Sequence, residues 1–252
     1  MADFATESGH WYAKDGSPAY TMKGANGKER AVTLRDARKL GLLQSVTTIC
    51  RLEAKPQLEK WKIQQACLSC MTLPRVPGES DDSFMGRALE DSKQQAIKAA
   101  ARGTRIHGLI ELAVGGNLQP DDMEIVTPVM TWIKVNFGGY QWFPERSFAG
   151  EGFGGKIDLF GMCGDEAVVI DFKVKAGISG KSTLAYDEHI TQLAAYANGM
   201  GAPAARCINL FIDADIPGLI VPHEWSAEDL NDGWLAFNCL LTLWRVRKGY
   251  SP

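Results

Sequence analysis

The sequence predicts a mixed α/β fold in which a helical amino-terminal half precedes a β-sheet core. In the stretch Gly154–Lys173, two apolar runs rich in β-branched and aromatic residues flank the turn sequence Cys-Gly-Asp-Glu, as in a β-hairpin. The stretch from 83 to 116 is rich in residues that favour helices. Together with the segments after the hairpin, these patterns predict the order helix, helix, three strands, helix, two strands, helix.

Length and composition indicate one globular α/β unit with elaborations. The chain has 252 residues, of which 45% are hydrophobic, so it can bury a sizeable core. We expect a helical or irregular elaboration over residues 1–80 and the α/β core over residues 81–252. The net charge of -3 excludes a globally basic nucleic-acid-binding protein, so phosphate binding would need a local basic patch.

The location of the protein is predicted from what the sequence lacks. The amino end is polar without the apolar segment of a secretory signal, and no run of about eighteen apolar residues predicts a transmembrane helix. We therefore expect a cytoplasmic protein without a membrane partner. Among six scattered cysteines only Cys67 and Cys70 are close, and a zinc or iron–sulfur site needs further ligands at matching spacing. Reduced thiols and no iron–sulfur cluster are expected.

The amino-terminal half carries several helix signals. Residues 1–44 predict short irregular strands or a loosely packed arm, interrupted by a short helix that Thr33 caps and Gly41 ends. Pro56 suits the first turn of a second helix. The long helical region begins near residue 81, and Gly103 is expected to divide it in two.

The remaining elements are punctuated by proline, glycine and capping residues. Pro144 predicts an edge position or a bulge in its strand. Ser226 opens a capping box at the start of the last helix. The expected elements are a helix from about 120 to 137, strands over 140–149, 205–213 and 218–225, and helices over 187–199 and 226–247.

Charged residues on the hairpin are the first candidates for a site. Asp158 lies on the first strand, and Asp171 and Lys173 end the second. Side chains alternate across a strand, so Asp171 and Lys173 share a face while Phe172 lies on the other. Burying such charges is costly unless they pair or hold a metal, and a hard divalent cation with oxygen ligands would supply the reason.

Other candidates lie on neighbouring elements. His107 and Glu111 share a helix face, and their weight depends on whether that face meets the hairpin. Glu145 stands in an aromatic setting, either as a site carboxylate or in an ion pair with Arg146 or a lysine.

The segment after the hairpin adds basic and polar side chains. Lys175 and Lys181 lie in a glycine-bearing loop that could contact phosphates or be simply solvated. Gln192 and Tyr196 are four residues apart on one helix face, for a positioning role or for packing.

Four motifs in order resemble the PD-(D/E)xK nuclease superfamily, with the RecB-like exonuclease branch as the most similar. They are Gly103-Thr-Arg-Ile-His107, Gly155-Lys-Ile-Asp158, Asp171-Phe-Lys173 and Gln192-Leu-Ala-Ala-Tyr196. Ser45-Val-Thr-Thr-Ile, with Lys55-Pro56 and Trp61-Lys62, is similar to the amino-terminal segment of phage and mitochondrial exonucleases. The resemblance implies a restriction-endonuclease-like core, a central mixed β-sheet flanked by helices. The chain lacks the cysteine pattern of the iron–sulfur members and any helicase motif.

The resemblance also implies roles for the candidate residues. Asp158 and Asp171, with the Phe172 carbonyl, would bind Mg²⁺ or Mn²⁺. The bound ion would polarise the phosphate and activate water. Lys173 would orient or deprotonate that water. His107 would complete the metal shell or contact the phosphate. Glu145 or Glu111 could bind the same metal or a second one. Gln192 and Tyr196 would position the nucleic-acid backbone or Lys173.

The function implied is that of a metal-dependent exonuclease acting on linear DNA ends, single- or double-stranded. A phage-type role in recombination, replication or repair is expected, with a recombinase or single-strand-binding protein as a further partner. The alternatives are a structure-specific or restriction-like endonuclease on the same fold and a non-catalytic nucleic-acid-binding protein. The last would be marked by loss of Asp158, Asp171 or Lys173, and all three are present.

Overall fold

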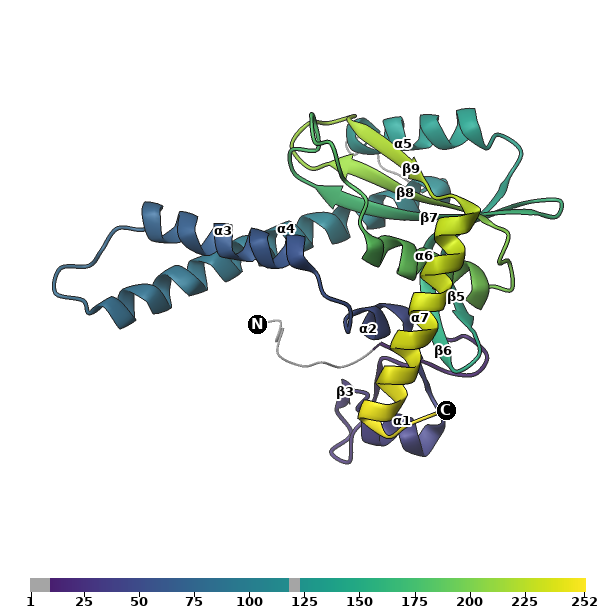
Figure 1. Cartoon of the computed structure of the whole chain (residues 1–252), viewed down its shortest axis with the longest axis horizontal. Helices are drawn as coiled ribbons and strands as arrows, with labels where there is room; N and C mark the ends of the chain where they lie inside the picture. The colour runs from purple at the N-terminus through teal and green to yellow at the C-terminus, as the bar shows by residue number, and fades with distance from the viewer. Residues whose placement is uncertain (1–9, 118–122) are drawn as a thin grey trace.

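The computed structural model describes residues 10–117 and 123–252, and their elements follow in chain order (Figure 1). The strands are β1 (Trp11–Tyr12), β2 (Thr21–Lys23), β3 (Glu29–Ala31), β4 (Leu43–Ser45), β5 (Gln141–Ala149), β6 (Phe153–Cys163), β7 (Glu166–Lys175), β8 (Arg206–Asp213) and β9 (Ile220–Glu224). The helices are α1 (Leu34–Leu40), α2 (Val46–Cys50), α3 (Pro56–Thr72), α4 (Asp81–Val114), α5 (Met123–Asn136), α6 (Asp187–Gly199) and α7 (Ala227–Lys248).

A mixed sheet organises the described residues. Seven strands lie in the order β1-β4-β6-β7-β8-β9, with β5 also paired to β6. Strands β5, β6 and β7 form an antiparallel meander, helix α6 crosses over, and β8 returns parallel to β7. A parallel neighbour requires such a crossover connection. The predicted fold class is confirmed: an α/β fold with a central mixed sheet flanked by helices, consistent with a restriction-endonuclease-like core.

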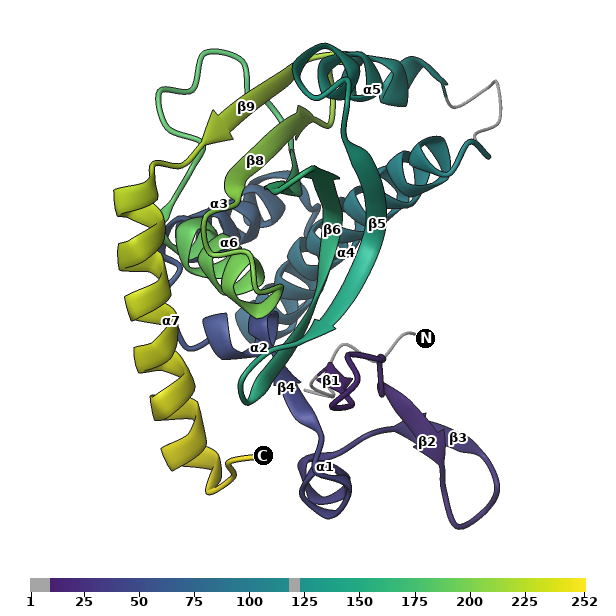
Figure 2. The same ribbon diagram turned by 90° about the vertical axis from the view of Figure 1, so that its right-hand side faces the viewer.

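Helices cover both faces of the sheet (Figure 2). Helices α4 and α5 pack on one face through a cluster that includes Ile110, Val129 and Ile170. Helices α2, α6 and α7 cover the other face through a second cluster that includes Ile49, Leu193 and Phe237. Strands buried on both faces read as near-continuous apolar runs, which explains why the hairpin strands are apolar at successive positions.

Most expected element boundaries are confirmed. The hairpin turn is Gly164-Asp165, and Gly164 adopts φ 57, a left-handed conformation that glycine accepts without steric cost. Thr33 and Ser226 cap their helices with capping boxes, and Pro56 is the first residue of α3. The expected helix start at Pro120 lies outside the described residues.

One expectation about the amino-terminal half is wrong and another is confirmed. Gly103 does not divide the long helical region, because α4 runs unbroken from 81 to 114. Glycine lowers helix stability by only about 1 kcal/mol, and the surrounding alanines favour the helix. The short strands expected in the first segment are confirmed as β1, β2 and β3, and in β1 Trp11 and Tyr12 are each 2% exposed. The ring of Trp11 packs against Trp244 and Tyr250 from the far end of the chain.

The division at residue 80 stays a prediction. Residue 80 lies between α3 and α4, which form a helical hairpin that projects from the rest of the protein (Figure 1). A hydrogen bond of 2.8 Å from Ser69 Oγ to Asp91 Oδ2 joins the two helices. Strand β4 belongs to the main sheet through its parallel pairing with β6. Among the described residues, no helix has the length and apolar character needed to span a membrane.

Replacing Gly103 by alanine tests the continuity of α4. An alanine Cβ would meet Val174 Cβ at 4.0 Å, an ordinary van der Waals contact, so Gly103→Ala should raise the free energy of unfolding by about 1 kcal/mol. That corresponds to about 2–4 °C in Tm for a chain of this size. The matched control is Gly177→Ala, which should destabilise because Gly177 has φ 60. A lower Tm for Gly103→Ala would indicate a broken or kinked helix.

Candidate active site

The site lies where strands β6 and β7 separate. Their pairing ends at Leu159 and Ile170, so Asp158 and Asp171 occupy the next position on each strand. Strand β5 follows one edge of β6 from residue 154 to 162. Because a strand has only two edges, β4, which pairs with residues 153 and 154, must use the edge that β7 has left. Asp158 therefore faces a gap in the sheet.

A paired distortion of β5 and β6 lies at the same position. Ile157 and Phe160 both pack in the cluster beneath α6, although a separation of three residues would put them on opposite faces of a regular strand. Phe143 and Phe148 break the alternation in β5 in the same way. The register is unchanged on either side, and Glu145, opposite Asp158, has a positive φ of 51. At the pair of Glu145 and Asp158, both strands therefore switch which alternate residues point toward the cluster beneath α6.

Asp171 is a buried carboxylate with three side-chain donors. The residue is 3% exposed. Its Oδ1 accepts a hydrogen bond of 3.1 Å from Gln192 Nε2. Its Oδ2 lies 2.7 Å from Lys173 Nζ and accepts a bond of 2.8 Å from Asn209 Nδ2. This network supplies the partners that a buried charge needs.

Gln192 joins the carboxylate to the ammonium and to the helix. Its Oε1 accepts a bond of 3.2 Å from Lys173 Nζ, and its Nε2 donates to Tyr196 Oη at 2.8 Å as well as to Asp171. Tyr196 is 3% exposed, and its ring packs edge-on against Phe148. The structure thus brings Asp171, Lys173, Gln192 and Tyr196 together, one pair from β7 and one from α6.

Asp158 is reached from the opposite face of the sheet. Its Oδ2 accepts a bond of 2.9 Å from the Phe172 main-chain N–H and lies 3.5 Å from His107 Nδ1 on α4. The imidazole also packs edge-on against the Phe172 ring. Burial by itself raises the pKa of Asp158, but the hydrogen bond and charge of His107, with the charge of Lys173, outweigh it and lower the pKa. The face of α4 that carries His107 therefore meets the hairpin.

The charges of Asp171 and Lys173 depend on each other. Burial raises the pKa of Asp171, the ammonium of Lys173 opposes that shift, the nearby Asp158 adds to it, and the net shift is upward. Burial lowers the pKa of Lys173, but the charge of Asp171 and their hydrogen bond outweigh it, so that pKa is raised. Lys173 is thus an ammonium at neutral pH.

The two aspartates stay predicted ligands of a hard divalent cation. Burial is the main cause of the raised pKa of Asp171, and the charge of Asp158 adds to it; a cation bound beside both carboxylates would oppose these shifts. Among residues 10–117 and 123–252, no group of three or more histidine, cysteine and acidic side chains lies at metal-binding separations. A site with two carboxylates would leave the other positions to water, phosphate or main-chain oxygen, as is usual for Mg²⁺. The Phe172 carbonyl stays a predicted ligand.

Glu145 and Glu111 both act on Lys156. Glu145 forms an ion pair with Lys156 on the neighbouring strand, and it lines a hollow beside β5. Burial lowers the pKa of Lys156, but the hydrogen bond and charge of Glu145, with smaller contributions that include the exposed Glu111, raise it overall. A direct metal contact for either glutamate stays a prediction.

Lys175 and Lys181 differ in their surroundings, because Lys175 is the last residue of β7, paired with β8, and does not lie in the predicted loop. Lys175 Nζ donates to the Leu184 carbonyl at 3.0 Å and lies 4.6 and 4.9 Å from the ring centroids of Tyr186 and Phe211. Its side chain is therefore half-buried, with the ammonium against these two rings. Lys181 is exposed and donates to the Ala176 carbonyl at 3.1 Å. Nucleic-acid binding by either lysine stays a prediction.

Sequence reasoning missed Asn209 and Trp225. Asn209 is fully buried on β8 directly opposite Asp171 in the parallel register. Its Oδ1 accepts a bond of 2.8 Å from Trp225 Nε1. The sequence did contain a clue to a buried polar residue, because Asn209 is the one amide within the apolar run Cys-Ile-Asn-Leu-Phe-Ile.

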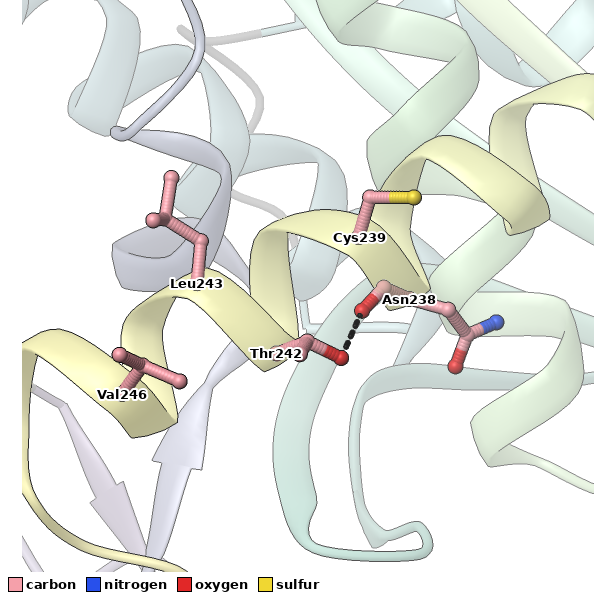
Figure 3. Close-up of a pocket in the computed structure, with 5 residues that line it drawn as sticks. All are labelled: Asn238, Cys239, Thr242, Leu243 and Val246. Carbon is pink, nitrogen blue, oxygen red and sulfur yellow. Dashed lines mark hydrogen bonds between the residues drawn. The ribbon is translucent and has the colours of Figure 1, made fainter.

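The protein has another hollow on the exposed side of α7, of about 500 Å³ (Figure 3). Its lining residues are Asn238, Cys239, Thr242, Leu243 and Val246. Thr242 Oγ1 donates to the Asn238 carbonyl at 2.8 Å, so its hydroxyl is satisfied within the helix. None of the predicted site residues lines this hollow.

Comparisons with known proteins are sparse. No protein-family model matches the sequence, and no curated protein matches it. Among solved structures, an alkaline exonuclease (LHK-Exo) from Laribacter hongkongensis is similar over 76% of this chain and 95% of its own, with 14% identity and a TM-score of 0.33. The protein SSO0001 is similar over 56% and 71%, with 18% identity and a TM-score of 0.26. Likenesses this loose indicate at most a distant relationship, and they carry no argument about activity.

The partial burial of Lys175 predicts a pH-dependent stability. Burial, and then the nearby charge of Lys173, lower the pKa of Lys175 from 10.5 to about 8. Between these values the unfolded chain binds more protons than the folded one, so stability rises with pH. The wild type should therefore gain stability relative to Lys175→Met as pH increases from 8 to 10.5.

Urea unfolding at several pH values measures this difference. Lys181→Met, which alters an exposed lysine of the loop that follows β7, is the matched control for the series. A difference between wild type and Lys175→Met that stays constant across the window would contradict the partly buried ammonium.

Proposed function

We propose that the protein is a nuclease that hydrolyses phosphodiester bonds in DNA with the help of Mg²⁺ or Mn²⁺. The observation that carries the proposal is the convergence of Asp158, Asp171 and Lys173 at the gap between β6 and β7. Phosphodiester hydrolysis requires a polarised phosphate, an oriented water and a stabilised leaving oxygen. Asp158 and Asp171 would hold a divalent cation, which would supply polarisation of the phosphate and charge neutralisation.

The protein groups have separable tasks in this proposal. Asp158 and Asp171 would hold the cation and so help to position the scissile phosphate. Lys173 orients or deprotonates the attacking water and offsets the developing negative charge. Gln192 holds Asp171 and Lys173 at a fixed separation through its two bonds. His107 neutralises and orients Asp158 from the other side.

The finer proposal is an exonuclease that acts on linear DNA ends in the cytoplasm, in phage-type recombination, replication or repair. Its support is the ordered set of four motifs, whose His107, Asp158, Asp171, Lys173, Gln192 and Tyr196 lie in one connected network. A recombinase or single-strand-binding protein would act beside it.

Isosteric changes at the site test the nuclease proposal. Asp171→Asn and Lys173→Met should each lower the cleavage rate of labelled linear DNA at least about a hundredfold, because each removes a charge that stabilises the transition state. The assay compares Mg²⁺, Mn²⁺ and EDTA, and circular dichroism establishes that the variants are folded. The matched control is Asp165→Asn, an exposed aspartate in the turn at the other end of β7, which should leave the rate unchanged. Wild-type rates in both site variants would sink the assignment.

Covalently closed DNA distinguishes the exonuclease from its alternatives. An enzyme that requires free ends should degrade a linearised plasmid and leave the same plasmid intact as a closed circle. The measurement is gel analysis of both forms under identical metal conditions. Cleavage of the circle would indicate an endonuclease, and metal-independent DNA binding without cleavage of either form would indicate a binding protein.

A further inference from the structure

Asn209 lies at the centre of a hydrogen-bonded chain that extends the candidate site to the far strand of the sheet. The residue is fully buried on β8, and both polar atoms of its side chain are engaged. Nδ2 donates to Asp171 Oδ2 at 2.8 Å, and Oδ1 accepts from Trp225 Nε1 at 2.8 Å. A buried amide is costly unless its bonds are made, so this pair of contacts requires an explanation beyond packing.

Trp225 determines which way the Asn209 amide points. An indole N–H can only donate, so the amide oxygen must face Trp225 and the NH₂ group must face Asp171. A reversed amide would place a carbonyl oxygen against the carboxylate and an NH₂ group against the indole N–H. The indole therefore selects the amide orientation that gives Asp171 a donor.

The position of Trp225 is itself set by the end of the sheet. Trp225 follows β9, and its main-chain N–H donates to the Cys207 carbonyl on β8 at 3.0 Å. Its ring packs edge-on against His223, with 4.2 Å between the ring centroids. The hairpin of β8 and β9 thus fixes the indole relative to Asn209.

The carboxylate of Asp171 is held from two sides as a result. Gln192 donates to Oδ1 from helix α6, and Asn209 donates to Oδ2 from strand β8. Rotation of the carboxylate about its terminal bond would break at least one of these bonds. Lys173 contacts Oδ2 as well, but its flexible side chain can follow a rotating carboxylate, whereas a buried amide on a central strand cannot.

We propose that Asn209 and Trp225 are positioning residues that hold Asp171 in the orientation required for cleavage, with Trp225 acting through Asn209. The inference rests on the proposed nuclease function for its kinetic consequences. Its structural content, the coupling of the Trp225 indole to Asp171 through the Asn209 amide, is independent of any activity.

The kinetic test uses Trp225→Phe and Asn209→Leu. Trp225→Phe keeps an aromatic ring and removes the N–H, so the amide loses its orientation while the core stays filled. Loss of such a supporting bond typically lowers activity about 10–100-fold. We expect this loss in kcat with KM for DNA changed less than about twofold, because the DNA-binding surface is untouched. Trp234→Phe on α7, whose ring stacks on Phe237, is the matched control and should keep wild-type kcat.

A spectroscopic test separates this inference from the nuclease proposal. The indole ¹H–¹⁵N signal of Trp225, assigned by its loss in Trp225→Phe, should shift in Asp171→Asn and in Asn209→Leu, while the Trp234 signal stays in place. A Trp225 signal that Asp171→Asn leaves unchanged would overturn the inference. If the signal shifts as expected in a protein without nuclease activity, the proposed function fails and the positioning network stands. Wild-type kcat in Trp225→Phe in an active enzyme would overturn the positioning role.

Discussion

The buried charge of Asp171 is the constraint on which the site depends. A carboxylate in the core is stable only if its charge is paired and its oxygens accept hydrogen bonds. Here Lys173 pairs with the charge, and Gln192 and Asn209 donate hydrogen bonds. Each donor comes from a different part of the fold, namely the same strand, the crossover helix and the next parallel strand. The sheet order β6-β7-β8 and the position of α6 are therefore coupled to one carboxylate. Removing any one donor would leave the others around a poorly compensated charge.

The gap between β6 and β7 gives this network access from both faces of the sheet. In a continuous ladder, a side chain reaches only the layer on its own face. Where the ladder ends, His107 from α4 reaches Asp158, and Gln192 from α6 reaches Asp171. The paired distortion at Glu145 and Asp158 keeps the register of β5 and β6 while changing which residues face each layer. Distortions of this kind recur where a strand must re-aim a side chain at a functional site.

Local patterns predicted the elements well because their causes are local. Capping residues at Thr33 and Ser226 and the turn glycine Gly164 act within a few residues, so their effects could be read directly. The predicted helix break at Gly103 was wrong, because a glycine weakens a helix only modestly and the helix-favouring neighbours keep α4 continuous. Lys175 also depended on its surroundings: the composition of the segment indicated a solvated loop, but Lys175 ends β7 and its ammonium lies against Tyr186 and Phe211.

The sequence by itself determined the fold class, the hairpin, and the pairs that regular geometry places on one face, Asp171 with Lys173 and Gln192 with Tyr196. Spacing along a strand or helix is enough for such pairs, because their periods are set by the backbone. Only the tertiary structure decided that His107 reaches Asp158, that Glu145 pairs with Lys156, and that Asn209 and Trp225 complete the network. These contacts join residues distant in sequence, and they depend on strand order and register, which side-chain spacing along the chain does not encode.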